Sequence, residues 1–139
     1  MPDAIPCSPN EELDGLVYFP RLCDKVRLFA AGELRDDFHE NLGHGMDLWT
    51  CQFLGVSYDD LANVIRNGAS NADALAWART HGLTRPPHEA AWWRSFMTAR
   101  GFRDDMAPRL ALRKHEAGFD ERDDIQTFFD FIDADEGRL

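Results

Sequence analysis

The sequence predicts an all-α fold, a compact single-domain bundle of about six or seven short helices that cross at steep angles. Short runs of apolar residues recur along the chain at the spacing of amphipathic helices. Each run is followed by a glycine, a residue that commonly ends a helix. No stretch shows the alternation of a strand with comparable clarity. The capping glycines are Gly32, Gly55, Gly68, Gly82, Gly101 and Gly118.

The length of the chain indicates one domain. With 139 residues, 44% of them hydrophobic, it has enough apolar side chains to fold around a single core. Residues 1–14 contain Pro2, Pro6 and Pro9, which resist both helix formation and strand pairing. We therefore expect an extended N-terminal arm over residues 1–14 and a single helical domain over residues 15–139.

The first part of the domain contains two predicted helices separated by a long loop. Pro20 suits the first position of a helix, and the apolar residues after it lie on one helical face. Residues 33–45 lack a clean period and are expected to form a long loop, a kind of segment that often carries function. Residues 46–54 are apolar almost all round, so we expect a buried central helix there.

Capping residues and prolines mark the later helices. Ser57 and Ser70 each stand before a helical pattern, with an aspartate three residues further on, in the manner of a capping box. The Pro86-Pro87 pair opens the next helix. Two more helices are expected over residues 104–117 and about 121–134.

The composition argues against several classes of partner. Fifteen basic and twenty-five acidic residues give a net charge of −10, the wrong sign for nucleic acid or an anionic membrane surface. The N-terminus lacks the pattern of a secretory signal, and no apolar stretch is long enough to span a bilayer. Three cysteines without a C-x-x-C pair fit neither a disulfide scaffold nor a zinc ribbon. We therefore expect a soluble cytoplasmic protein.

Four motifs, spread over most of residues 15–136, are informative together. They are Pro20-Arg21-x-x-Asp24-Lys25-x-Arg27, Gly45-Met46-Asp47 leading to Phe53-Leu54-Gly55, Ala74-Leu75-Ala76-Trp77, and Ile125-x-x-Phe128-Phe129-Asp130-x-Ile132-Asp133-x-Asp135. In these motifs the chain resembles the domain-of-unknown-function 5069 family, a group of small bacterial proteins. The Pro-Arg-x-x-Asp-Lys motif is the most specific part of the likeness. The resemblance implies a bacterial origin and a single helical domain, and it brings no agreed activity.

The same Pro-Arg-x-x-Asp-Lys motif contains a first candidate site. On a helix that begins at Pro20, the side chains of Arg21, Asp24 and Lys25 lie on one side, next to the apolar stripe. Arg21 and Lys25 repel each other unless anions accompany them, and Asp24 supplies only one negative charge. A bound carboxylate or phosphate would supply the rest, with Arg21 as a bidentate clamp and Tyr18 as a nearby donor. The alternative is a solvated ion ladder or a link to an acidic partner helix.

A second candidate site lies at the start of the helix expected over residues 46–54. His44, Asp47 and Cys51 share one face if that helix extends back to His44. A histidine held by a carboxylate is a candidate general base, so His44 and Asp47 are the catalytic candidates. The alternatives are nucleophilic catalysis by Cys51, a metal site, and a structural role in which Asp47 complements the helix N-terminus. Trp49, on the same helix, is a further candidate for ligand binding, beside Tyr18, Arg21, Asp24 and Lys25.

Familiar cofactor and metal motifs do not occur. Each His-Glu pair lacks the second histidine of an H-E-x-x-H zinc motif, and Gly43-His44-Gly45 lacks the third glycine of a dinucleotide fingerprint. Neither lysine lies in a phosphate-binding loop. We therefore predict no cofactor and no metal.

The leading functional hypothesis is a pocket for a small anionic metabolite between the first helix and the helix over residues 44–51. Catalysis there would be cofactor-free acid–base chemistry of an isomerase, lyase or hydrolase type. On this hypothesis Arg21→Ala removes ligand binding and leaves the melting temperature nearly unchanged. The alternative is a protein-interaction or homo-oligomerisation module without catalysis. It is favoured by the adjacent Trp92 and Trp93, which lie about 100° apart on a helix and cannot both face the core.

Overall fold

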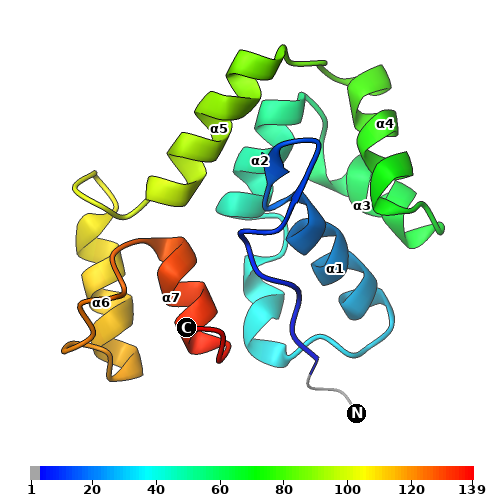
Figure 1. The fold of residues 1–139 in the computed structure, drawn as a ribbon. Helices are drawn as coiled ribbons and strands as arrows, with labels where there is room; N and C mark the ends of the chain where they lie inside the picture. The colour runs from blue at the N-terminus through cyan, green and yellow to red at the C-terminus, as the bar shows by residue number, and fades with distance from the viewer. Residues whose placement is uncertain (1–3) are drawn as a thin grey trace.

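The computed structural model describes residues 4–139 and confirms the all-α class (Figure 1). Residues 1–3, the first part of the expected arm, lie outside the described residues. The described chain forms seven α-helices, one 3-10 helix and one two-stranded hairpin. The elements are β1 (Glu12–Leu13), β2 (Leu16–Val17), α1 (Phe19–Ala30), the 3-10 helix η1 (Asp36–Asn41), α2 (Met46–Leu54), α3 (Tyr58–Arg66), α4 (Asn71–His81), α5 (Pro87–Ala99), α6 (Ala107–Ala117) and α7 (Phe128–Asp135).

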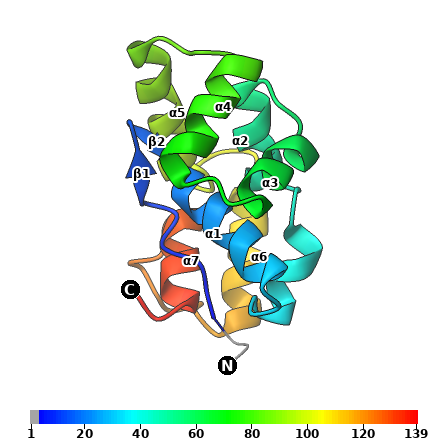
Figure 2. The ribbon, with the colours of Figure 1, turned by 90° about the vertical axis from the view of Figure 1, so that its right-hand side faces the viewer.

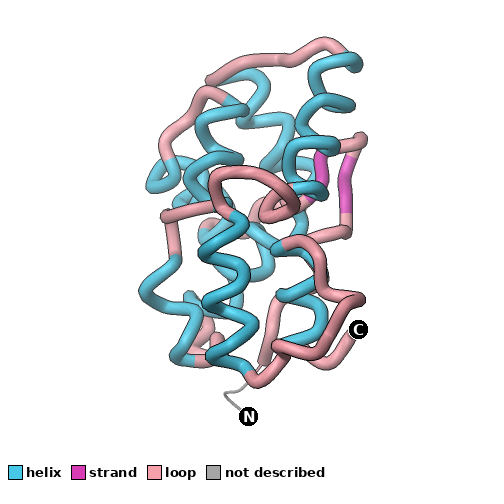
Figure 3. Tube along the Cα trace, turned by 90° about the vertical axis from the view of Figure 1, so that its left-hand side faces the viewer, coloured by secondary structure: helices cyan, strands magenta, loops and turns pink. Residues whose placement is uncertain are grey.

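The helices form two groups that α5 connects (Figures 1 and 2). In the first group α1 packs against α3 and α4, and α2 packs against α3. In the second group α6 packs against α7. The α5 helix contacts both β2 and α7, so it links the group around α1 to the pair at the C-terminal end. The two short strands lie side by side (Figure 3). They pair antiparallel, with Leu13 opposite Leu16.

The core lies mainly between α1, α3, α4 and the hairpin. Its side chains include Leu22, Val26, Leu61, Ile65, Leu75 and Ala78. Trp93 of α5 closes one side, and its indole Nε1 donates a hydrogen bond to the backbone oxygen of Val17 at 3.2 Å. Trp92 is 66% exposed, whereas Trp93 is 6% exposed. The two adjacent tryptophans therefore face different environments, as their helical spacing predicts.

Most helix starts follow the predicted local chemistry. The hydroxyl oxygens of Ser57 and Ser70 accept hydrogen bonds from the backbone N–H groups of Asp60 and Asp73, both at 3.1 Å. The helix over residues 46–54 begins and ends where the sequence predicts. A glycine is required at position 82, because a Cβ there would overlap the backbone oxygen of Leu54. This close approach brings the end of α4 against the end of α2.

The last helix was expected from about residue 121, and this start is wrong: α7 begins at Phe128. Thr127 caps it by accepting a hydrogen bond from the backbone N–H of Asp130 at 3.1 Å. The preceding residues form a loop, because the Lys114 amine donates to the backbone oxygens of Arg122 and Ile125 at 2.8 and 3.0 Å. These oxygens are therefore satisfied without a helix.

Smaller differences occur elsewhere. The helix expected over residues 104–117 begins only at Ala107. The expected loop over residues 33–45 contains η1, and the expected arm ends in a strand at Glu12. The rest of the described arm is extended, and its Pro6 is buried. Among residues 4–139, no helix has the length and apolar character needed to cross a membrane.

The buried cysteines predict a loss of stability in alkali. Burial raises the pKa of Cys23 and of Cys51 from 9.0 to about 12, so the folded protein keeps thiol protons that the unfolded chain releases. The stability from this source is therefore complete below pH 9 and is lost as the pH rises towards 12. We expect Cys51→Ala to reduce the pH slope of the unfolding free energy by about 1.4 kcal/mol per pH unit near pH 10.5. Urea denaturation under reducing conditions measures this slope, and equal slopes in both proteins would contradict the prediction.

Candidate functional site

The α1 helix carries two buried cations one turn apart. Arg21 is 3% exposed and Lys25 is 5% exposed, although both are charged at neutral pH in ordinary surroundings. They are i and i+4 on the same helix, so they lie on the same side of it. Two buried cations at this spacing require nearby negative groups, and the structure shows that two different segments of the chain supply them.

The partner of Lys25 is Asp47 on α2. The Lys25 amine donates to Asp47 Oδ1 at 3.0 Å, and the Tyr18 hydroxyl donates to the same oxygen at 2.7 Å. The other oxygen of Asp47 accepts the backbone N–H of Gly43 at 3.0 Å. Asp47 is completely buried, and these three hydrogen bonds replace the water that its carboxylate has lost.

Burial changes the titration of both groups beside Asp47. It lowers the pKa of Lys25 below 10.5, and the attraction of Asp47 offsets this only in part. The pKa of Tyr18 is well above 10.0, first because the phenol is buried and then because the charge of Asp47 opposes its ionisation. Tyr18 therefore keeps its proton and serves as a hydrogen-bond donor to Asp47. Its backbone has a φ of 75°, in the left-handed region that glycine prefers, and the buried ring and its hydrogen bond hold it there.

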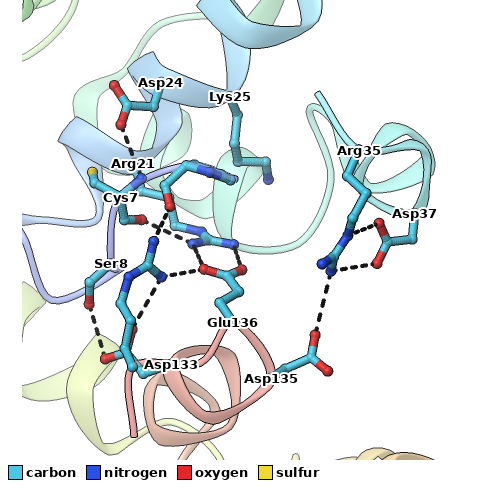
Figure 4. Close-up of polar contacts among 12 residues, drawn as sticks. Cys7, Ser8, Arg21, Asp24, Lys25, Arg35, Asp37, Asp133, Asp135 and Glu136 are labelled. Atoms are coloured by element: carbon cyan, nitrogen blue, oxygen red, sulfur yellow. Dashed lines mark hydrogen bonds and ion pairs between the residues drawn. The ribbon is translucent and has the colours of Figure 1, made fainter. Parts of the chain in front are cut away.

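The partner of Arg21 is Glu136, at the C-terminal end of α7. The guanidinium donates two parallel hydrogen bonds to the two carboxylate oxygens, at 2.8 and 2.6 Å (Figure 4). It also donates to the backbone oxygen of Cys7 at 3.0 Å. Burial opposes the charge of Arg21, but the contact with Glu136 outweighs it and raises the pKa of Arg21. Arg138 forms a second ion pair with the same carboxylate.

Asp24 faces the N-terminal arm. Its carboxylate accepts the backbone N–H of Cys7 at 3.0 Å, and it does not line the same space as Lys25 (Figure 4). The next residue of the arm, Ser8, donates from its hydroxyl to Asp133 of α7 at 3.0 Å. The arm is thus hydrogen-bonded to both α1 and α7, and the Arg21 contact with Cys7 joins all three segments.

A cleft with a cavity volume of about 730 Å³ lies between α1, η1 and α2 on one side and α6 and α7 on the other. This volume is within the usual range for small-molecule sites. One wall includes Tyr18, Arg21, Lys25, Phe38, His44 and Trp49. The opposite wall includes Arg109, Arg113, Phe128, Phe131, Asp135 and Glu136.

Five of the seven predicted site residues line this cleft: Tyr18, Arg21, Lys25, His44 and Trp49. Asp47 is buried behind the wall, where it holds Tyr18 and Lys25. The His44 side chain is exposed, and among residues 4–139 no hydrogen bond joins it to Asp47. The expected histidine–carboxylate pair is therefore replaced by a lysine–carboxylate–tyrosine cluster.

Cys51 belongs to the core, where burial and the charge of Asp47 raise its thiol pKa to about 12. It therefore stays protonated at neutral pH, which disfavours the alternative of nucleophilic catalysis by this residue. Within residues 4–139, no group of three histidine, cysteine or acidic side chains is arranged to hold a metal ion.

The model of a family described as domain of unknown function (DUF5069) matches residues 3–138. The chain belongs to the DUF5069 family. A search of curated proteins and a search of solved structures find no match. Because the matched range contains every residue of the cleft, the cleft is part of the DUF5069 domain itself.

The sequence interpretation missed the far wall of the cleft in this DUF5069 chain. Arg109 and Arg113 lie one turn apart on α6, where the sequence indicates a helix and no site residue. Glu136 is also absent from the predicted site residues, yet its carboxylate is 2% exposed. The repulsion between Arg21 and Lys25 did indicate that negative groups must be present, but the leading interpretation assigned them to a bound ligand, whereas the structure supplies Glu136 and Asp47. The repulsion could not indicate which acids, because Glu136 is 115 residues from Arg21.

The buried ion pair between Arg21 and Glu136 reverses the expectation that Arg21→Ala leaves the melting temperature nearly unchanged. Removing one partner from a buried ion pair leaves the other charge without compensation, so we expect a loss of about 3 kcal/mol in unfolding free energy. The matched control is Arg35→Ala, which removes a similar pair with Asp37 that is more exposed and should cost less than about 1 kcal/mol. Urea denaturation of both variants measures the difference. Equal small losses would show that the Arg21–Glu136 pair does not stabilise the fold.

Proposed function

We propose that this DUF5069 protein binds a small metabolite with an anionic group and an apolar part in the cleft between α1 and α6. The observation that carries the proposal is the cleft itself, whose volume suits a small molecule and whose two walls both contain cations. Mixed polar and aromatic lining is typical of small-molecule sites, since apolar surface supplies affinity and a few polar groups supply orientation.

The anionic group is expected to bind on the α6 side of the cleft. The charges of Arg21 and Lys25 are already balanced by Glu136 and Asp47. Arg113 forms an ion pair with Glu116 at 3.3 Å. Among residues 4–139, Arg109 has no ion pair, and its side chain is exposed on the cleft wall. A guanidinium in this position suits a carboxylate or phosphate, which it contacts with two parallel hydrogen bonds.

The apolar part of the ligand has aromatic surface on both walls. Trp49 of α2 faces the cleft on one side, and Phe128 and Phe131 of α7 line the other. Aromatic rings bury a large area at a small entropic cost, so they suit the non-polar part of a metabolite. His44 lies exposed on the cleft wall, where it is the group placed to exchange protons with a bound ligand.

We place this activity in the cytoplasm of a bacterial cell. The three cysteines are all free, and the two in the core are too deeply buried to pair without unfolding. Free cysteines are typical of a reducing compartment.

The test is a binding measurement with a matched pair of arginine variants. Thermal-shift screening of the protein against metabolite carboxylates and sugar phosphates identifies a ligand, because a ligand that binds only the folded state raises the melting temperature. Calorimetry then gives its affinity. Loss of a charge-assisted hydrogen bond in Arg109→Gln is expected to weaken binding by about tenfold or more.

The control is Arg66→Gln, which removes an exposed arginine on α3, outside the cleft. We expect it to leave the affinity unchanged. A ligand whose affinity falls equally in both variants binds through the overall charge of the protein, and the proposed site would then be wrong. A screen without any reproducible shift would also contradict the proposal.

A further inference from the structure

Lys25 stands out among the basic residues of the chain. Thirteen of the fifteen basic residues are arginines, and the two lysines are Lys25 and Lys114. Arginine is the better residue for a buried, static pair with a carboxylate, because its planar guanidinium binds both oxygens at once. The chain uses this solution one turn earlier, at Arg21. A lysine amine differs from a guanidinium in one chemical respect: it can lose its proton and act as a nucleophile.

The surroundings of Lys25 supply what a nucleophilic amine requires. Burial on the cleft wall disfavours its charged form and lowers its pKa. The Asp47 carboxylate, 3.0 Å from the amine, is in position to accept a proton. The Tyr18 hydroxyl accepts a hydrogen bond from the amine at 3.3 Å and donates its own proton to Asp47 at 2.7 Å, so a proton can pass between Asp47 and Tyr18 beside the amine. The three groups are within hydrogen-bond distance of one another, so they form a single proton-transfer cluster.

Lys25 also borders the cleft in which a reactant would bind. A lysine ammonium has three N–H donors, and among residues 4–139 its side-chain partners are Asp47 and Tyr18. One donor direction therefore remains unused, and the residue borders the cleft. In Figure 4 the Lys25 side chain extends from α1 into the space between Arg21 and Arg35. By contrast, the Lys114 amine lies outside the cleft and donates to two backbone oxygens.

We propose that Lys25 forms an imine with a small aldehyde or ketone that carries an anionic group and binds in the cleft. This inference rests on the proposed function, because Arg109 would hold the anionic group while the carbonyl carbon meets the amine. It defines the substrate class more narrowly than binding alone, since only a ligand with a carbonyl group reacts. No oxidant, metal or cofactor is required.

Imine formation consumes the carbonyl compound and releases one molecule of water. The Lys25 ammonium gives one proton to Asp47, and the nitrogen lone pair then attacks the carbonyl carbon and forms the C–N bond. The electron pair of the C=O π bond moves to oxygen, which takes a proton from Tyr18, and the protonated Asp47 then gives its proton to Tyr18. The nitrogen passes a second proton through Asp47 to the hydroxyl oxygen. The nitrogen lone pair forms the C=N bond as the C–O bond breaks, and the oxygen leaves as water. Two of the three ammonium protons thus depart with the oxygen, and the third stays on the imine nitrogen beside Asp47.

The experiment uses glyoxylate, a small aldehyde with a carboxylate, on the full-length protein. Sodium cyanoborohydride reduces an imine to a stable amine, and peptide mapping by mass spectrometry then locates the label. Since the chain has only two lysines, Lys114 is an internal control. We expect labelling of Lys25 to be faster than that of Lys114 by about 100-fold, the lower end of what a positioned proton-transfer group contributes. In urea the two lysines should react at similar rates.

Two variants and one analogue make the result specific. Lys25→Arg keeps a cation opposite Asp47 and should abolish the label at this position. Tyr18→Phe removes the proposed proton donor while keeping the ring, and should slow the labelling of Lys25 by about 100-fold. Circular dichroism checks that both variants fold. Glycolate has the same carboxylate without the carbonyl, so it tests binding alone.

The outcomes separate this inference from the proposed function. If glycolate and glyoxylate both raise the melting temperature and neither labels Lys25, the cleft binds anions and the imine is wrong. If Lys25 and Lys114 are labelled at similar rates in the folded protein, the reaction is unspecific and the imine is again wrong. If glyoxylate neither binds nor labels, both the imine and the binding of small carboxylates are contradicted. Fast, saturable labelling of Lys25 that glycolate inhibits supports both.

Discussion

The structure depends on the burial of two cations on one face of α1. An unpaired buried charge costs more than a small domain can tolerate, so Arg21 and Lys25 must each contact a carboxylate. Asp47 meets Lys25 from α2, and Glu136 meets Arg21 from the end of α7. These contacts bring α2 and the end of α7 to the same face of α1, and the cleft is the space that remains between α2 and α7. The residues that stabilise the fold are therefore also those that border the candidate site.

The elements of this fold that local chemistry determines are predictable from the sequence. Ser57 and Ser70 cap their helices through hydrogen bonds that span only three residues, and a pattern of that length is visible in the sequence. The start of α7 was missed for a related reason. Ile125 has the right spacing to extend the apolar stripe of that helix, but Thr127 caps it later and the distant Lys114 holds the preceding loop. Periodicity does not reveal such a contact.

The candidate site is predictable in part. Five of seven predicted residues line the cleft, and helical spacing alone brings two of them, Arg21 and Lys25, to the same side of α1. The proton-transfer groups differ from the prediction because the partners of Asp47 come from another part of the chain. Asp47 contacts Lys25 and Tyr18 rather than the neighbouring His44. The far wall was missed because α6 lies across the cleft from α1 only in the folded chain. The match to the DUF5069 family includes all of these residues but assigns no activity to them. The inference of function therefore rests on the cleft.

The titration of Lys25 tests the central claim most directly. With ¹³C-labelled lysine, NMR shows one ε-carbon resonance for each of the two lysines, and Lys25→Arg assigns them. A buried amine on the cleft wall should titrate below the ordinary lysine pKa of 10.5, because burial opposes its charge more strongly than Asp47 favours it. A Lys25 resonance that titrates at 10.5 or above would contradict the account, since the amine would then be solvated or held permanently charged, and unable to act as a nucleophile.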